Sequence, residues 1–266
     1  MPHSSRRAAV LPGAPVRRSR AMHDLALREI GSAIVRGDYP VGSLLPSKEE
    51  LMATLDVSHT TIREALQTLT AKGMIVARAR VGTRVLEEAH WNMFDAELLG
   101  WRLEAGMPRW LLAMLLEIRQ SIEPLAAALA ATHRSKADLK RLRTLLERMQ
   151  DYPGNGDDGF VEADVSFHKL VLAMSGNSFM ASLATVTSTA LAASFQLSAP
   201  DRDPPLAHLV HDQHAAIVDA IEARDPQAAS DAMGAAIRQG WTNMHGLRPR
   251  RLAAIDLLTF PVANGT

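Results

Sequence analysis

Cysteine is absent from the sequence. Its absence excludes disulfide bridges and thiol chemistry, and it fits a protein that works in a reducing cytoplasm. Long apolar runs are absent too, since none approaches the roughly 18 residues that a membrane-spanning helix needs. The N-terminus carries paired arginines but no continuous apolar segment, so it is unlike a secretory signal. We therefore expect a cytoplasmic protein without a membrane partner. We expect residues 1–21 to be a disordered basic tail, either a plain solvated extension or a contact to phosphates.

An excess of either charge is also lacking, because 29 lysine and arginine residues balance 29 aspartate and glutamate residues. This balance hides an asymmetry along the chain. Residues 1–88 contain 13 basic and 9 acidic side chains, whereas residues 89–266 contain 16 basic and 20 acidic ones. A basic first part joined to an acidic second part indicates that only the first part meets a polyanion.

Three helices are expected early in the chain. Apolar residues at helical spacing predict the first over residues 22–36. Ser47, followed three residues later by Glu50, is a capping box that opens a short second helix. After a tight connection, Ser58 can cap a third helix that runs to about Lys72.

Two short β-prone runs follow, residues 74–80 and 83–87, and they predict a hairpin. Two helices, a tight turn, a third helix and a hairpin make a winged helix-turn-helix domain. We assign this domain to residues 22–88. In such a domain the third helix enters the major groove of DNA with its N-terminal end first.

Short polar side chains and a guanidinium gather where the third helix begins, and such groups suit contacts to phosphates and base edges. The alternatives are that Ser58 only caps the helix and that Arg63 pairs with Glu64 or Asp56. The predicted DNA contacts at this end are Ser58, His59, Thr60, Thr61 and Arg63.

Three arginines alternate with small or apolar residues along the hairpin, namely Arg78, Arg80 and Arg84. A period of two places such residues on one face of a strand. A solvated face is one interpretation. Without an acidic partner in the run, contacts to phosphates or to the minor groove are the interpretation we favour.

From about His90 the composition changes to alanine, leucine and methionine, and no segment has a strand pattern. We expect an all-α antiparallel helical bundle over residues 89–245, which binds an effector and forms a dimer, followed by a C-terminal tail over 246–266. The core of such a bundle is a common place for a ligand site. The expected helices lie near residues 92–104, 108–133, 136–151, 158–175, 178–197, 205–224 and 226–245.

The bundle contains candidate metal ligands. Asp164 and His168 are four residues apart and share one helix face, and His214 begins an apolar face of another helix. An aspartate and two histidines that converge in a bundle can bind a divalent metal. Each of these residues alone could instead be a hydrogen-bonded core residue, and His208 and His211 compete with His214.

Arg119 borders an apolar helix face. A guanidinium in that position either pairs with a protein carboxylate or receives the carboxylate of a ligand. Glu123, four residues further on, is the obvious internal partner.

The segments Leu45–Leu51, Val57–Leu66 and Gly82–Val85 resemble the GntR family of bacterial transcription regulators. The family pattern usually has arginine where His59 stands, and some members have a DNA-contacting arginine at the position of Glu49. These departures concern base specificity and not the fold.

The second part resembles the FCD effector domain of the FadR-type subfamily. The matching pieces are Arg119 with Glu123-Pro124, Asp164-x-x-x-His168 followed by Ser175-Gly176-Asn177, and His214 with Ile217 and Ile221. The resemblance implies that the aspartate and histidines bind a metal, often zinc, and that Arg119 meets the carboxylate of an organic acid. We assign Asn177 to the effector site as well.

The subfamily's last metal histidine should fall near Ala236, where this sequence has none. The site then either completes its shell with water or effector oxygens, or binds no metal and contacts the effector directly. The stretch Trp91–Trp101 resembles regulators of sugar-acid catabolism within the subfamily. A sugar acid is therefore the expected effector, with a lactate-, pyruvate- or fatty-acyl-type acid as the alternative.

Together these patterns predict a homodimeric repressor that binds a pseudo-palindromic operator and is released by a small carboxylate. One rival is a metal-dependent hydrolase with a DNA-binding head, for which no general-base motif is present. Another is an architectural DNA-binding protein without a ligand. We expect no enzymatic activity.

Overall fold

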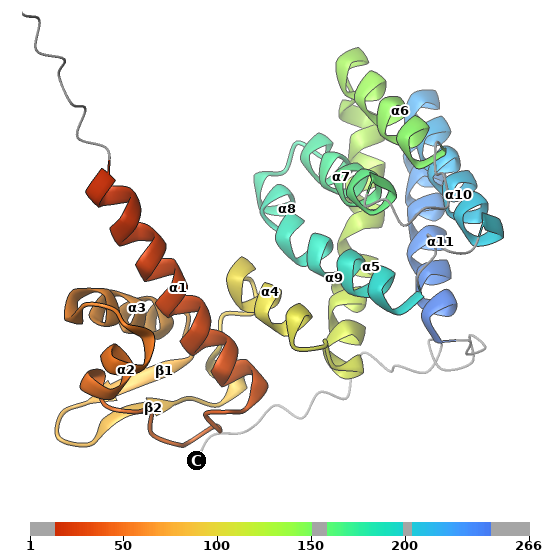
Figure 1. Cartoon of the computed structure of the whole chain (residues 1–266). Helices are drawn as coiled ribbons and strands as arrows, with labels where there is room; N and C mark the ends of the chain where they lie inside the picture. The colour runs from red at the N-terminus through yellow and green to blue at the C-terminus, as the bar shows by residue number, and fades with distance from the viewer. Residues whose placement is uncertain (1–13, 151–158, 199–203, 246–266) are drawn as a thin grey trace, which may run out of the picture. The chain divides into compact units, whose positions relative to one another are not determined.

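The computed structural model describes residues 14–150, 159–198 and 204–245, and its contacts divide the chain into two compact units after Gly106. The first unit combines helices with a two-stranded antiparallel hairpin, and the second consists of helices in the described residues (Figure 1). The mainly α fold class, with a winged helix-turn-helix followed by an all-α bundle, is confirmed. The expected tails fall largely outside the described residues, but residues 14–21 of the first tail already belong to a helix.

The first three helices are α1 (Ala14–Arg36), α2 (Lys48–Leu55) and α3 (His59–Ala71). Helices α2 and α3 begin where their capping residues predict, whereas α1 begins at Ala14 and not at the expected residue 22. At the start of α2, Glu50 N donates to Ser47 Oγ at 3.2 Å and Ser47 N donates to Glu50 Oε2 at 2.7 Å. At the start of α3, Thr61 N donates to Ser58 Oγ at 3.2 Å. These bonds satisfy amides that a helix leaves without partners at its N-terminus.

The hairpin consists of β1 (Ile75–Arg78) and β2 (Gly82–Val85), which pair with Ile75 opposite Val85. Its buried ends, Ile75 and Val85, join the apolar core that α1, α2 and α3 form. Gly73 turns the chain from α3 into β1 with φ +74°, and an added Cβ would lie 2.0 Å from the carbonyl oxygen of His90. Only glycine fits this position, because both the left-handed backbone and the neighbouring carbonyl exclude a side chain.

A further helix, α4 (Ala96–Glu104), belongs to the first unit, preceded by a short 3-10 turn, η1 (Glu88–His90). The ring of Trp101 fills the space beside Gly31 of α1, where an added Cβ would lie 2.3 Å from the ring. Lys72, at the end of α3, reaches Asp95 Oδ2 at 2.6 Å and Glu97 Oε2 at 2.7 Å.

Residues 89–106 therefore pack with the first unit, whereas the sequence pattern assigned them to the helical bundle. The reason is that Trp91, Leu98 and Trp101 are buried in the same core as α1 and α3. Apolar residues that pack into one core fold as one body, so the compact first unit extends to Gly106 and does not stop at residue 88.

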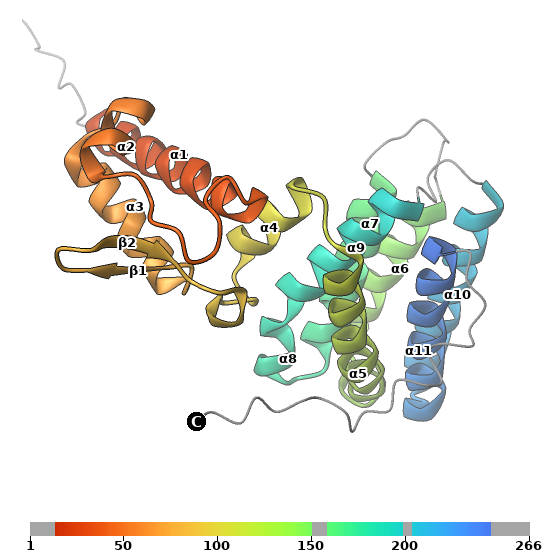
Figure 2. The ribbon, with the colours of Figure 1, turned by 90° about the horizontal axis from the view of Figure 1, so that it is seen from below.

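The second unit is built around the long helix α5, which contacts α7, α9, α10 and α11 (Figure 2). Its core is apolar, with large side chains such as Phe160, Phe167 and Leu142 fully buried. The expected helix over 178–197 is divided in two at Leu183. The helices are α5 (Arg109–His133), α6 (Lys136–Gln150), α7 (Gly159–Met174), α8 (Ser178–Ser182), α9 (Ala184–Ser198), α10 (Pro204–Ala223) and α11 (Pro226–His245).

None of the helices in the described ranges combines the length and the apolar character needed to cross a membrane.

Candidate metal site and DNA-binding surface

Four of the five predicted contacts at the N-terminal end of α3 are exposed, namely Ser58, His59, Thr60 and Arg63. The hydroxyls of Ser58 and Thr61 hydrogen-bond each other at 2.9 Å, and Thr61 is buried. Ser58 is thus occupied as the helix cap. Within the part of the chain that the structure describes, Arg63 forms no ion pair, so the alternative pairing with Glu64 or Asp56 does not occur.

The hairpin presents its arginines in three different ways. Arg78 is exposed at the end of β1, and Val76 pairs with Arg84, so Arg78 and Arg84 share one face. Arg84 is half-buried and donates from Nη1 to the carbonyl of Gly42. Arg80 is not in a strand, which corrects the expected alternation of three arginines on one strand face. It lies in the turn with φ +63°, a left-handed conformation that costs a residue with a Cβ about 1 kcal/mol or more.

In the second unit, Asp164, His168 and His214 come together in the core. Helix α7 supplies Asp164 and His168 on one face, and α10 supplies His214; all three are almost completely buried. One ligand atom from each lies within 4.8 Å of the others. His214 Nε2 lies 2.9 Å from Asp164 Oδ1 and 3.3 Å from His168 Nε2.

In both imidazole rings the Nδ1 atom makes a hydrogen bond outside the cluster of candidate ligands. His168 Nδ1 lies 2.6 Å from Glu123 Oε2, and His214 Nδ1 lies 2.7 Å from the carbonyl oxygen of Val210. These partners can only accept, so each Nδ1 carries the proton and the two Nε2 atoms face each other and Asp164.

This geometry fits a divalent metal. Two nitrogens at the usual zinc distance of about 2.0–2.1 Å are about 3.4 Å apart in a tetrahedral shell, close to the 3.3 Å between the two Nε2 atoms. Asp164 Oδ2 is buried without a hydrogen-bond partner in the described structure, and a carboxylate oxygen in that position suits a cation. Ala236, at the position of the subfamily's last histidine, is partly buried against the core and offers no ligand atom.

The ionisable groups in the site shift one another's pKa values. Burial raises the pKa of Asp164, but the positive charges of His214, His168 and Arg119 together outweigh it, with His214 contributing most, so the pKa lies below its usual value. Burial likewise lowers the pKa of His214, but the Asp164 carboxylate raises it above its usual value. Asp164 thus favours the protonated form of His214, and a divalent ion at Nε2 would compete with that proton.

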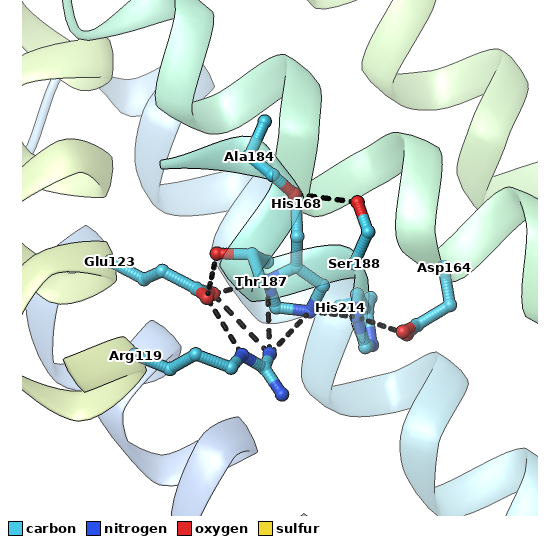
Figure 3. A network of polar contacts seen from close by, with 8 residues as sticks. All are labelled: Arg119, Glu123, Asp164, His168, Ala184, Thr187, Ser188 and His214. Carbon is cyan, nitrogen blue, oxygen red and sulfur yellow. Dashed lines mark hydrogen bonds and ion pairs between the residues drawn. The ribbon is translucent and has the colours of Figure 1, made fainter. Parts of the chain in front are cut away.

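Arg119 of α5 joins the same buried network (Figure 3). Its Nε donates to Glu123 Oε1 at 2.7 Å and its Nη2 donates to Glu123 Oε2 at 3.3 Å. Arg119 Nη2 also lies 3.5 Å from both ring nitrogens of His168. The internal pairing with Glu123 that the sequence offered as an alternative is thus present, and it places the guanidinium beside the candidate metal ligand His168.

Thr187 of α9 completes the network, since its Oγ1 donates to Glu123 Oε1 at 3.1 Å. Burial raises the pKa of Glu123, but Arg119 and His168 together lower it well below its usual value. Thr187 was not predicted from the sequence, because a buried threonine far along the chain has no distinguishing pattern.

The competing candidates lie outside the network. His208 is exposed, and His211 Nδ1 lies 3.4 Å from the exposed carboxylate of Asp212. Asn177 caps α8, where its Oδ1 accepts from Phe179 N at 3.0 Å. The structure thus gives Asn177 a capping role, and among the described residues no hydrogen bond joins it to the buried cluster.

Comparison with known proteins agrees with both units. Residues 26–85 match the family model for bacterial regulatory proteins of the gntR family, and residues 114–239 match the FCD domain. The chain belongs to the GntR family, in the group that carries an FCD domain. It is a transcriptional regulator and not an enzyme, so the hydrolase hypothesis is excluded.

Two curated relatives come from Escherichia coli strain K12. The uncharacterized HTH-type transcriptional regulator YieP is 35% identical over 79% of this chain and 90% of its own length. The galactonate operon transcriptional repressor is 31% identical over 76% of this chain and 88% of its own length, which confirms the expected resemblance to regulators of sugar-acid catabolism. Among solved structures, E. coli McbR/YncC has the same fold, with 17% identity and a TM-score of 0.51 over 85% of this chain and 97% of that one.

Membership in this family implies operator DNA as the partner of the winged helix-turn-helix, and a small molecule as the partner of the FCD domain.

Proposed function

We propose that this regulator is a cytoplasmic homodimeric repressor that leaves a pseudo-palindromic operator when a small organic acid, preferably a sugar acid, binds its second unit. The buried cluster of Arg119, Glu123, Asp164, His168 and His214 carries this proposal. Buried ionic groups are expensive even when paired, and apolar side chains would stabilise the core at least as well. A ligand-binding role accounts for a cluster that stability alone does not require.

In this proposal Asp164, His168 and His214 hold a divalent metal, with zinc preferred because nitrogen ligands at tetrahedral spacing suit it. The bound ion would offer positive charge and open coordination positions to effector oxygens. At least one coordination position stays open, because Ala236 stands where the subfamily has a histidine and its methyl group cannot bind a metal.

Arg119 receives the effector carboxylate. A guanidinium forms paired hydrogen bonds with a carboxylate, and Arg119 lies directly beside His168. An acid held by Arg119 therefore has its remaining oxygens next to the metal ligands. This arrangement suits a carboxylate with hydroxyl groups, and the galactonate operon repressor among the relatives supports the sugar-acid class.

In the first unit, the exposed side chains His59, Thr60 and Arg63 contact DNA from the recognition helix, while Ser58 and Thr61 hold its first turn in place. Arg78, Arg80 and Arg84 contact DNA from the wing. The dimer holds two recognition helices one DNA turn apart, and the effector favours a state with a different spacing.

The test is fluorescence anisotropy with DNA from the protein's own upstream region, at fixed salt, with and without a panel of aldonic and uronic acids. We expect one acid to weaken binding at micromolar to millimolar concentration. Arg119→Lys should abolish this response and leave DNA affinity unchanged, because lysine keeps the charge opposite Glu123 but cannot bind a carboxylate in bidentate fashion. Arg143→Lys, at an exposed ion pair with Glu222, is the matched control. Tight DNA binding that no acid alters would reject the sugar-acid effector.

A further inference from the structure

Glu123 has four hydrogen-bond contacts although it is almost completely buried, with 1% of its surface exposed. One oxygen accepts from Arg119 Nε and from Thr187 Oγ1, and the other lies against His168 Nδ1 and Arg119 Nη2. The carboxylate thus joins the arginine of the candidate effector site to a ligand of the candidate metal site (Figure 3).

The contact with His168 fixes which ring nitrogen carries the proton. Paired with Arg119, Glu123 is a carboxylate and can only accept, so His168 Nδ1 must donate. In the neutral ring this leaves the lone pair on Nε2, the atom 3.3 Å from His214 Nε2. The ring therefore presents a lone pair, and not a hydrogen, to the place where an ion would lie.

We propose that Glu123 is the positioning residue of the metal site: its carboxylate holds His168 in the Nδ1–H tautomer and thereby sets the affinity of the site for a metal. The inference rests on the proposed function, in which Asp164, His168 and His214 bind a divalent ion. Arg119 and Thr187 act through Glu123, because they fix the orientation of its two oxygens.

Glu123 does not itself join the metal shell. It contacts Nδ1, whereas the candidate ligand atom Nε2 lies on the other side of the ring, and the cluster of possible metal ligands consists of Asp164, His168 and His214. The second ring is oriented in a different way, by the main-chain carbonyl of Val210 on its own helix. A charged acceptor makes the imidazole more basic than a neutral carbonyl does, so Glu123 affects affinity as well as orientation.

The first measurement is the tautomer of His168 in the zinc-free full chain, read from ¹⁵N chemical shifts of the histidine rings by NMR. We expect the Nδ1–H form in the wild type and a mixture in Glu123→Gln, because an amide can either donate or accept. A role of Glu123 in packing alone would not change the tautomer. A wild-type protein with the proton on Nε2 would overturn the inference.

The second measurement is zinc affinity, determined by competition with a chromophoric chelator. Loss of a side chain that orients a metal ligand typically weakens binding by about 10–100-fold, and we expect this for Glu123→Gln. Glu117→Gln, on the same helix and without a contact to the network, should bind zinc as the wild type does. Zinc affinity in Glu123→Gln within twofold of the wild type would overturn the inference.

Glu123→Gln leaves Arg119 buried without its counter-charge, and that change alone can unfold the protein. The double variant Arg119→Met/Glu123→Gln removes both charges and keeps the core neutral. It should fold, as judged by circular dichroism, and should lose zinc affinity to the same extent; wild-type affinity in this folded variant would overturn the inference. A wild-type protein that binds no zinc would instead contradict the metal site of the proposed function, while the NMR measurement still tests the role of Glu123.

Discussion

The packing of Trp101 against Gly31 predicts that Gly31→Ala destabilises the protein when Trp101 is present and stabilises it when the ring is removed. A Cβ at position 31 would lie 2.3, 2.5 and 2.8 Å from three carbons of the Trp101 ring. Carbon atoms prefer separations of about 3.5–4.0 Å, so α4 or the ring must move by about 1 Å. Such overpacking costs roughly 1–3 kcal/mol, while replacing glycine by alanine within a helix gains roughly 0.5–1 kcal/mol. With about 2 kcal/mol for overpacking and about 0.75 kcal/mol for the helix gain, Gly31→Ala should destabilise the first unit by about 1 kcal/mol.

Removing the ring removes the clash. Trp101→Ala should by itself cost roughly 3–5 kcal/mol, as large aromatic truncations in cores do. In that background, Gly31→Ala should stabilise by roughly 0.5–1 kcal/mol, because only the helix preference of alanine remains. The coupling energy between the two positions is then about 2 kcal/mol, within the range for residues in direct contact.

Amide hydrogen exchange in α1 and α4 measures the local opening free energy of the full chain and is suited to this cycle. Gly100→Ala is the control within α4, since a Cβ there meets no atom within 4 Å, and it should stabilise slightly. If Gly31→Ala is neutral or stabilising with Trp101 present, the ring does not occupy the position that the structure gives it.

Three further predictions concern the helix cap, the DNA surface and the metal. The backbone amide of Ser47, and then its hydroxyl, lower the pKa of Glu50, so the capping box stabilises α2 above about pH 4.5 and this stability is lost as the pH falls through the lowered pKa. Ser47→Ala removes the hydroxyl and keeps the amide, so it should raise that pKa part of the way to its usual value in a ¹³C NMR titration; an unchanged pKa would contradict the contribution of the hydroxyl. Arg63→Ala should weaken DNA binding and reduce the slope of log affinity against log salt by about 1; an unchanged slope in anisotropy titrations would mean that Arg63 does not meet a phosphate. Zinc at 100 times its dissociation constant should stabilise the second unit by about 2.7 kcal/mol; the rise in melting temperature should vanish in His214→Gln, and an equal rise in that variant would place zinc elsewhere.

Local signals in the sequence were enough to place the starts of α2 and α3, but not the start of α1. Ser47 with Glu50, and Ser58, each hydrogen-bond within a few residues, so their caps depend on nearby chain alone. The place of α4 could not be predicted in this way. Its membership of the first unit depends on Trp101 meeting Gly31, which is a contact between distant segments and leaves no periodic pattern in either.

The candidate site likewise contains residues that the sequence predicts and residues that it does not. The spacing of Asp164 and His168 fixes their common helix face, and the structure brings them to His214 as the metal hypothesis requires. Spacing alone could not choose among the three histidines of α10, because that choice depends on how α10 is rotated against α5 and α11. Thr187 could not be predicted for a similar reason, since it joins the site only by its hydrogen bond to Glu123 on another helix.

The packing of residues 89–104 has a consequence for protein engineering. A chimera that joins the first 88 residues to a foreign effector domain would leave the space beside Gly31 without its ring and Lys72 without Asp95 and Glu97. Its DNA-binding part would then carry an exposed apolar surface that favours aggregation. A crossover at Gly106 keeps this core whole, so effector domains of such regulators are best exchanged after that glycine.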